Sequence, residues 1–316
     1  MSLTLDPEVA QALAPMAAPI ADQTPPPVGD VLTLRAFQDH IMAQASDTLP
    51  MPDDVTMTGY HATAPDGAQI PMRWYAKKGS APGSAVLYTH GGGMILGSMD
   101  LDDRPIAGYV SASGTPMLSV DYRLAPEHRY PTQVQDAYAG LRWLDEHAKK
   151  LGVDRERIAV MGESAGGGLA AAVAIMARDQ AGPAIARQIL IYPMLDDRTT
   201  TIDAHIVRHA LWKYDDNVTG WGALLGNAAR GPDVPATAAP ARITDPAELP
   251  PAYIEVGQLD IFRDEDLTYA MRLGRAGVEV EFHLRPGVPH MFEMLAPASD
   301  VARRAIADRV RVLASL

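Results

Sequence analysis

A serine between two glycines is the feature that most constrains what this chain can fold into. The segment Gly162–Gly166 has the sequence Gly-Glu-Ser-Ala-Gly, with the apolar run Ile158–Met161 before it and an alanine-rich stretch, Ala165–Arg178, after it. This pattern predicts a strand that turns at once into a helix, and so sharp a turn leaves room only for small residues at positions 162 and 166. In isolation the pattern also fits an ordinary strand-to-helix loop. The flanking strand and helix favour a nucleophilic serine whose hydroxyl projects above the edge of a sheet.

Short apolar runs recur along the chain and alternate with stretches of helical periodicity. The predicted strands are Ala85–Thr89, Met117–Asp121, Ile158–Met161, Gln188–Tyr192, Ala252–Val256 and Val278–Leu284. The predicted helices are Thr132–Lys150, Ala165–Arg178, Arg263–Ala276 and Ala298–Leu313. Strands without strict polar alternation, separated by helices, are typical of a mostly parallel sheet that is covered on both faces. The sequence therefore predicts an α/β fold.

Three further segments precede or interrupt this alternation of predicted strands and helices. Residues Gly29–Ala45 have apolar side chains at three- and four-residue spacing, which predicts an amphipathic helix. The stretches Val55–Thr63 and Gln69–Ala76, joined by a Pro- and Gly-containing turn, predict an antiparallel hairpin. Residues from about 198 to 231, which include Trp212 and Trp221, predict an insertion over the carboxyl edge of the sheet.

The composition excludes several classes of protein. The 316 residues include no cysteine, which excludes a disulfide framework, a thiolate zinc site and a cysteine nucleophile. The formal charge of −12 opposes binding to nucleic acid and to anionic membrane surfaces. No apolar run reaches the ~18 residues of a membrane span, and the N-terminal residues do not resemble a secretory signal. We therefore expect a cytoplasmic protein that binds neither nucleic acid nor membrane.

A second glycine-rich segment, His90–Gly97, directly follows a predicted strand. Its three successive glycines allow the backbone to approach a substrate oxygen and to point N–H groups at it, as a developing oxyanion requires. The segment does not fit a dinucleotide loop, because position 96 is leucine, and it lacks the lysine of a phosphate-binding Walker loop. We expect His90 to anchor this loop by hydrogen bonding rather than to act as a base.

Among the nine histidines, His290 is the best candidate for the general base. It lies in a Pro- and Gly-rich loop that leaves the last predicted strand, where sheet enzymes place functional groups. His283 alternates with acidic residues within that strand, which places it on the wetter face and makes it a poor candidate. His205 and His209 are four residues apart, but no carboxylate cluster at metal-binding spacing accompanies them. We interpret them as a surface pair and expect no metal.

The acid that orients the base is best assigned to Asp260, in the loop after the strand Ala252–Val256. Asp196 and Asp197, after the preceding predicted strand, are its main rivals. The acidic residues 264–266 are better interpreted as the first turn of the next helix, where the helix dipole favours negative charge.

Several longer segments resemble one family. These are Asp121–His128 (Asp-Tyr-Arg-Leu-Ala-Pro-Glu-His), the acid segment Gly257–Asp260, and His-Gly-Gly-Gly ahead of a nucleophile, acid and base in the order Ser164, Asp260, His290. Together they resemble the hormone-sensitive-lipase-like (family IV) bacterial esterases of the α/β-hydrolase fold. The resemblance extends from about residue 75 to the C-terminus. It implies a mostly parallel central sheet with helices on both faces and a helical cap.

The resemblance also implies roles for individual residues. The backbone N–H groups of Gly92, Gly93 and Ala165 would form the oxyanion hole. The motif residues that support the site would be His90, Gly91, Gly162, Glu163 and Gly166. Glu163 departs from the family, which most often has Asp or Thr there, and methionine follows His290 where glycine is more usual. By position, residues 1–50 with 198–231 correspond to the cap, and 51–197 with 232–316 to the catalytic domain.

The sequence thus predicts a serine carboxylesterase for small-molecule esters with short to medium acyl chains, which needs no cofactor. Met94, Ile95 and Leu96, with Trp212 or Trp221, are expected to form an apolar wall for the substrate. An amidase or lactone hydrolase with the same triad is the alternative within enzymes, and a non-catalytic small-molecule receptor is the alternative outside them. Pairing of the strand Val278–Leu284 across a two-fold axis would give a homodimer, although its acidic residues could equally protect an edge.

Overall fold

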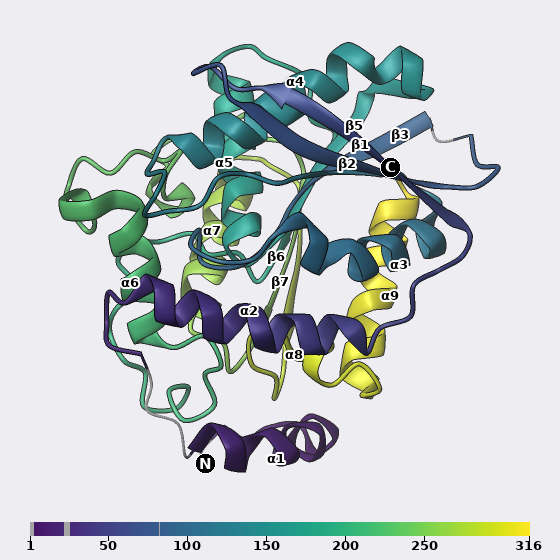
Figure 1. The fold of residues 1–316 in the computed structure, drawn as a ribbon. Coiled ribbons are helices and arrows are strands. Elements are labelled where there is room, and N and C mark those ends of the chain that lie inside the picture. The colour runs from purple at the N-terminus through teal and green to yellow at the C-terminus, as the bar shows by residue number, and fades with distance from the viewer. Residues whose placement is uncertain (1–2, 22–25, 82) are drawn as a thin grey trace.

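The computed structural model describes residues 3–21, 26–81 and 83–316 (Figure 1). Residues 1–2 and 22–25 of the expected cap, and residue 82 of the expected catalytic domain, lie outside the described residues. None of the helices formed by the described residues combines the length and the apolar character needed to cross a bilayer.

The described residues form one sheet of eight strands, in the order β1-β2-β4-β3-β5-β6-β7-β8. The strands are β1 (Val55–Thr63), β2 (Gln69–Lys77), β3 (Gly83–Thr89), β4 (Met117–Val120), β5 (Val153–Glu163), β6 (Gln188–Ile191), β7 (Ala252–Gly257) and β8 (Val280–Arg285). β2 pairs antiparallel with β1 and with β4, and every pairing from β4 to β8 is parallel. The mostly parallel sheet, the hairpin and all six predicted strands are therefore confirmed.

Helices cover both faces of the sheet (Figure 1). One face packs against α4 (Thr132–Leu151), α5 (Ala165–Asp179) and α7 (Arg263–Arg275). The other face packs against α3 (Asp103–Ser113) and the C-terminal helix α9 (Asp300–Ala314). Because both faces are covered, the central strands β3 and β6 are apolar without alternation, as the sequence predicted.

Helix α3 was not expected from the sequence. Its buried residues, Ile106, Ala107, Tyr109 and Val110, span little more than one turn, which is too short for helical periodicity to be recognised. The other helices that the sequence analysis did not single out are α1 (Pro7–Ala21), α6 (Tyr214–Leu225) and the short α8 (Phe292–Leu295).

The predicted amphipathic helix is α2 (Val31–Asp47), and it contacts α6 of the insertion. The backbone N–H of Gly29, just before α2, donates to Oγ1 of Thr219 in α6 (2.9 Å). Helix α1 packs elsewhere, with Val9 in an apolar cluster formed with Phe292 of α8 and Val301 of α9. The N-terminal segment therefore contacts both the insertion and the region that follows His290.

Candidate active site

Three side chains from three loops meet at the carboxyl ends of the parallel strands. Nε2 of His290 lies 2.9 Å from Oγ of Ser164, and Nδ1 of His290 lies 2.6 Å from Oδ2 of Asp260. All three residues are buried. The second oxygen of Asp260 accepts a hydrogen bond from the backbone N–H of Phe262 (3.0 Å), which fixes the carboxylate. The structure thus brings together the three residues that the sequence singled out as nucleophile, base and acid.

The turn at Ser164 is as sharp as the sequence predicted. Ser164 lies between the end of β5 and the start of α5 with φ 55° and ψ −120°, a strained conformation for a residue with a side chain. A Cβ on Gly162 would lie 2.2 Å from the carbonyl oxygen of Gly166, and a Cβ on Gly166 would lie 2.0 Å from that of Thr89. Only glycine therefore fits at either position, and the crowding holds the serine at the tip of the turn.

The glycine-rich loop lies directly beside this turn. Gly92 has φ 114°, and a Cβ there would lie 2.1 Å from the carbonyl oxygen of Leu96, so the loop folds back on itself too tightly for a side chain. In the described part of the chain, the backbone N–H groups of Gly92, Gly93 and Ala165 donate no hydrogen bond. His90 anchors the loop, since its ring stacks on Tyr122 and its Nδ1 lies 2.7 Å from the carbonyl oxygen of Gly91.

Helix α2 holds the far end of this loop. Nε of Arg35 donates to the carbonyl oxygen of Ile95 (2.5 Å), and the backbone N–H of Gly97 donates to Oδ1 of Asp39 (2.9 Å). Arg35 also forms two hydrogen bonds of 2.8 Å with the carboxylate of Glu127. The expected cap helix thus contributes two polar side chains that fasten the glycine-rich loop.

The cavity above Ser164 is small and largely apolar. Its lining residues are Gln38, Met42, Gly91, Gly92, Gly93, Leu96, Asp102, Glu163, Ser164, Tyr192, Trp212, His290, Met291 and Met294. Its volume is about 30 Å³, room for only a few water molecules. Of the expected apolar wall, Leu96 and Trp212 line the cavity. Met94, Ile95 and Trp221 are buried but do not line it, so this part of the expected wall is wrong.

Comparison with known proteins agrees with this geometry. Residues 86–294 match the sequence profile of the α/β-hydrolase fold family. The chain belongs to the α/β-hydrolase fold family. The predicted resemblance to hormone-sensitive-lipase-like (family IV) esterases is confirmed, and so is the fold class.

Several relatives of this α/β-hydrolase are named as esterases or ester hydrolases. It is 39% identical to Esterase LipI of Mycobacterium tuberculosis over 70% of this chain and 65% of that protein, so the match spans just under two thirds of LipI. It is 33% identical to Ethyl acetate hydrolase of Pseudomonas putida, over 79% of this chain and 80% of the relative. A solved structure, Bacterial Heroin Esterase, superposes with a TM-score of 0.89 at 36% identity and covers 99% of this chain and 98% of its own.

The two aspartates that rival Asp260 for the acid role form ion pairs with arginines and not with His290. Asp196 pairs with Arg198 (2.8 Å), and buried Asp197 pairs with Arg242 (2.6 Å). His283 hydrogen-bonds to Glu281 (2.8 Å) rather than to a member of the triad. Of these three aspartates, only Asp260 therefore contacts His290.

The interpretation of residues 264–266 as a helix first turn is correct in position but incomplete. Glu265 is buried and accepts hydrogen bonds from the backbone N–H groups of Leu195 (2.6 Å) and Asp196 (3.1 Å). Asp266 is also buried, and burial raises its pKa well above the ordinary value. Both side chains therefore belong to the interior beneath the insertion rather than to a solvated helix end.

The expected surface pair, His205 and His209, lies in the insertion. His205 is exposed and His209 is half-buried, and both lie in a turn segment rather than on one face of a helix. Within residues 3–21, 26–81 and 83–316, no three His, Asp or Glu side chains gather in a way that could hold a metal ion.

Two buried carboxyl groups line the cavity beside Ser164, and only one of them was singled out from the sequence. Burial raises the pKa of Glu163 to about 8, an effect that the positive charge of Arg309 opposes. Burial likewise raises the pKa of Asp102 to about 7, although a hydrogen bond from Tyr88 (3.1 Å) opposes it. Asp102 was missed because it precedes a helix that the sequence did not predict. Near neutral pH, Glu163 therefore carries a proton, which removes a negative charge from the side of the nucleophile.

We expect kcat of the hydrolase to fall as the pH rises through about 8, where Glu163 ionises beside the reacting atoms. The fall should be at least about tenfold, because at an effective dielectric of about 20 a unit charge still contributes about 1.4 kcal/mol across about 12 Å. The groups that face Glu163 are Arg309 of α9, Tyr109 of α3, Tyr192 after β6, Glu293 of α8 and Asp102. The measurement is the pH profile of kcat for the wild type and for Glu163→Gln, which cannot ionise and should lose this limb.

Glu156→Gln is the matched control, because Glu156 is an exposed glutamate of the same strand and should leave the profile unchanged. An alkaline limb that persists unaltered in Glu163→Gln would assign the limb to another group.

The raised pKa of Glu163 also affects the stability of the fold. The folded protein keeps this proton up to about pH 8, whereas the unfolded chain loses it near the ordinary value of 4.5, so this group lowers the free energy of unfolding as the pH rises between them.

Proposed function

We propose that the protein is a serine carboxylesterase in which Ser164 is the nucleophile, His290 the general base and acid, and Asp260 the residue that orients the histidine. The observation that carries the proposal is the continuous line of hydrogen bonds from Ser164 through His290 to Asp260 beneath a glycine-rich loop. The class of enzyme predicted from the sequence, a carboxylic ester hydrolase, agrees with the relatives.

Each reaction step has a residue in place for it. Nε2 of His290 takes the proton of Ser164 as its oxygen attacks the ester carbonyl, and the resulting oxyanion is stabilised by the N–H groups of Gly92, Gly93 and Ala165. The histidine then gives that proton to the leaving alcohol, and the acyl group stays on the serine. Water, deprotonated by the same histidine, attacks the acyl-enzyme; the histidine then returns that proton to Oγ of Ser164 as the C–O bond to the serine breaks and the acid product leaves.

Asp260 gives His290 the orientation that this sequence of steps needs. With Nδ1–H donated to Asp260, the lone pair of Nε2 faces the serine hydroxyl. Phe262 and Tyr192 pack edge-on against the imidazole ring, with centroid separations of 5.3 and 4.6 Å. These contacts limit rotation of the ring and support its role as a proton carrier.

We further propose the domain division predicted from the sequence. Residues 1–50 with 198–231 form a cap, and 51–197 with 232–316 form the catalytic domain. In support, Gln38 and Met42 of α2 and Trp212 of the insertion line the cavity together with Ser164. Cap residues therefore form part of the wall that a substrate must contact.

The substrates we propose are uncharged esters with short acyl chains, with medium chains as an upper limit. The cavity is about 30 Å³, so any acyl group needs neighbouring side chains to move. Three of those neighbours are Met42, Met291 and Met294, whose flexible side chains repack at low cost. The methionine after His290 thus contributes to an adaptable wall. A relative is named Ethyl acetate hydrolase, which agrees with small esters.

A panel of p-nitrophenyl acetate, butyrate, octanoate and palmitate tests both activity and chain length. We expect kcat/KM to be highest for acetate or butyrate and at least about tenfold lower for palmitate. The indole of Trp212 packs directly on Gly93, so Trp212→Ala opens the cavity and should raise the octanoate-to-acetate ratio about 5- to 10-fold. Trp143→Ala, which removes an indole stacked on His147 of α4, is the control and should leave the ratio unchanged.

An equal preference for all four chain lengths would contradict the substrate proposal. Matched p-nitroanilides and lactones in the same panel distinguish an esterase from an amidase or lactone hydrolase with the same triad. Binding of esters without release of p-nitrophenol would indicate the receptor alternative.

A homodimer through β8 and a cytoplasmic location remain predictions from the sequence. β8 forms one edge of the sheet, and a side chain on this strand, Glu281, pairs with Arg311 and with His283. In a homodimer that pairs β8 with its copy, these ion pairs would lie at or near the interface. Light scattering combined with size-exclusion chromatography measures the oligomeric state directly.

A further inference from the structure

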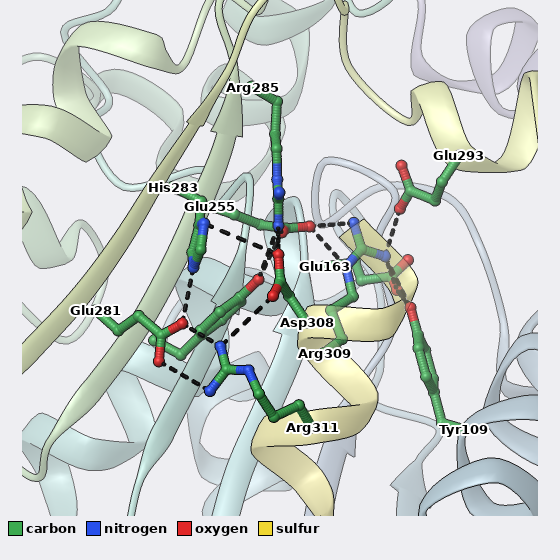
Figure 2. Close-up of polar contacts among 11 residues, drawn as sticks. Tyr109, Glu163, Glu255, Glu281, His283, Arg285, Glu293, Asp308, Arg309 and Arg311 are labelled. Carbon is green, nitrogen blue, oxygen red and sulfur yellow. Dashed lines mark hydrogen bonds and ion pairs between the residues drawn. The ribbon is translucent and has the colours of Figure 1, made fainter. Parts of the chain in front are cut away.

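The C-terminal helix α9 places one arginine, Arg309, entirely within the protein. Its guanidinium donates to Oε1 of Glu255 (2.6 Å from Nε), to Oε1 of Glu293 (2.7 Å from Nη1) and to the hydroxyl of Tyr109 (2.7 Å from Nη1). Nη1 also lies 3.8 Å from Oε1 of Glu163. Figure 2 shows these side chains converging on Arg309 from different parts of the fold.

The three carboxyl groups around Arg309 come from the three segments that carry the triad. Glu163 directly precedes the nucleophile, Glu293 lies three residues after the base, and Glu255 lies five residues before the acid, on β7. A single planar guanidinium therefore contacts one side chain from each of these segments.

A second route joins Arg309 to the base itself. Cζ of Arg309 lies 5.7 Å from the ring centroid of Tyr192, and the same ring packs against the imidazole of His290 at a centroid separation of 4.6 Å. The hydroxyl of Tyr192 donates to Oε1 of Glu293 (2.6 Å) and lies 3.4 Å from Glu163. The tyrosine thus packs between the arginine and the base.

Stability alone is a weak explanation for such a cluster. Buried ion pairs often contribute no more to folding than apolar residues of similar size, because desolvation offsets their attraction. What a guanidinium offers is a rigid set of donors in fixed directions, which lysine cannot reproduce. We propose that Arg309 is a positioning residue that fixes the relative placement of the segments carrying Ser164, His290 and Asp260. This inference rests on the proposed triad.

The experiment compares Arg309→Lys with Arg285→Lys. Arg285 shares the carboxylate of Glu255 (2.9 Å) and pairs with Asp308 (2.7 Å), and in the described part of the chain it forms no ion pair with Glu163 or Glu293. It is therefore a matched control within the same cluster, because it shares the carboxylate of Glu255 with Arg309 (Figure 2). The readouts are Tm, kcat and KM for p-nitrophenyl butyrate, and the rate at which a fluorophosphonate probe labels Ser164.

We expect Arg309→Lys to lower both kcat and the labelling rate about 10- to 100-fold, since a misplacement of about 1 Å can cost 10²-fold. KM should stay within about threefold, because Arg309 itself does not line the cavity. Both variants should lower Tm by similar amounts. In Arg285→Lys, however, kcat and the labelling rate should stay within about threefold of the wild-type values. If Arg309→Lys does not fold, Glu293→Gln decides, because it removes one charged partner of the arginine at nearly constant volume and should lower kcat about 3- to 10-fold.

Unchanged kcat in folded Arg309→Lys, or equal losses of kcat in the two arginine variants, would overturn the positioning role. If Arg309→Lys does not fold, unchanged kcat in Glu293→Gln would likewise overturn the positioning role. A wild type that is labelled by the probe but does not hydrolyse esters would instead contradict the proposed substrate class and leave the labelling comparison valid. A wild type that is not labelled would contradict the proposed nucleophile itself.

Discussion

Alanine in place of Ser164 is expected to lower kcat for p-nitrophenyl butyrate by about 10⁴-fold or more. The hydroxyl is the atom that would form the acyl-enzyme, and no other hydroxyl among the described residues hydrogen-bonds to His290. The residual rate should come from the oxyanion donors and from substrate binding. The measurement is steady-state hydrolysis, together with mass spectrometry of the protein after a brief exposure to substrate, which should find the acyl adduct only in the wild type.

Ser119→Ala is the matched control for this variant. Ser119 is also buried, lies in β4, and in the part of the chain described its Oγ has no hydrogen-bond partner. Removing that hydroxyl should leave kcat within about twofold. If Ser164→Ala retained the wild-type rate, the nucleophile would have to be a different residue and the proposed mechanism would be wrong.

The sequence was sufficient for the parts of the site that depend on local backbone chemistry. Glycine at 162 and 166 is required by atoms within a few residues or on the adjacent strand, and such a requirement leaves a short motif. The same holds for the tight loop at Gly92. His290 and Asp260, the proposed base and acid, each follow a strand whose apolar run is visible in the sequence, so their position at the carboxyl edge could be predicted.

Long-range contacts left no such pattern. Arg309 sits in a helix of ordinary amphipathic character, and nothing near it in the chain indicates that its guanidinium contacts Glu163 and Glu293. Arg35 and Asp39 likewise look like solvated residues of an exposed helix face, although they bind the glycine-rich loop about 60 residues away. Such pairings depend on how elements pack in three dimensions, which periodicity within one element does not describe.

The second large effect is expected for Asp260→Asn. By analogy with other serine hydrolases, the loss of kcat should be about 10⁴-fold, because the amide can donate to Nδ1 of His290 and so favours the tautomer that cannot accept the proton of Ser164. The substitution keeps the volume and one oxygen acceptor, so the hydrogen bond from the N–H of Phe262 can persist and the fold should be retained. The measurement is kcat/KM for p-nitrophenyl butyrate, with Tm determined in parallel.

Asp197→Asn is the comparison that separates loss of the acid from general damage. Asp197 is as deeply buried as Asp260, but one of its oxygens accepts from Arg242 (2.6 Å) and the other from the backbone N–H of Arg230 (2.5 Å). Breaking that buried charge pair should lower Tm and leave kcat of the folded enzyme within about threefold. The opposite order of effects would move the acid role to Asp197. That outcome would require Asp197 to release Arg242 and turn toward His290, and Asp260 would then be a structural residue of its loop.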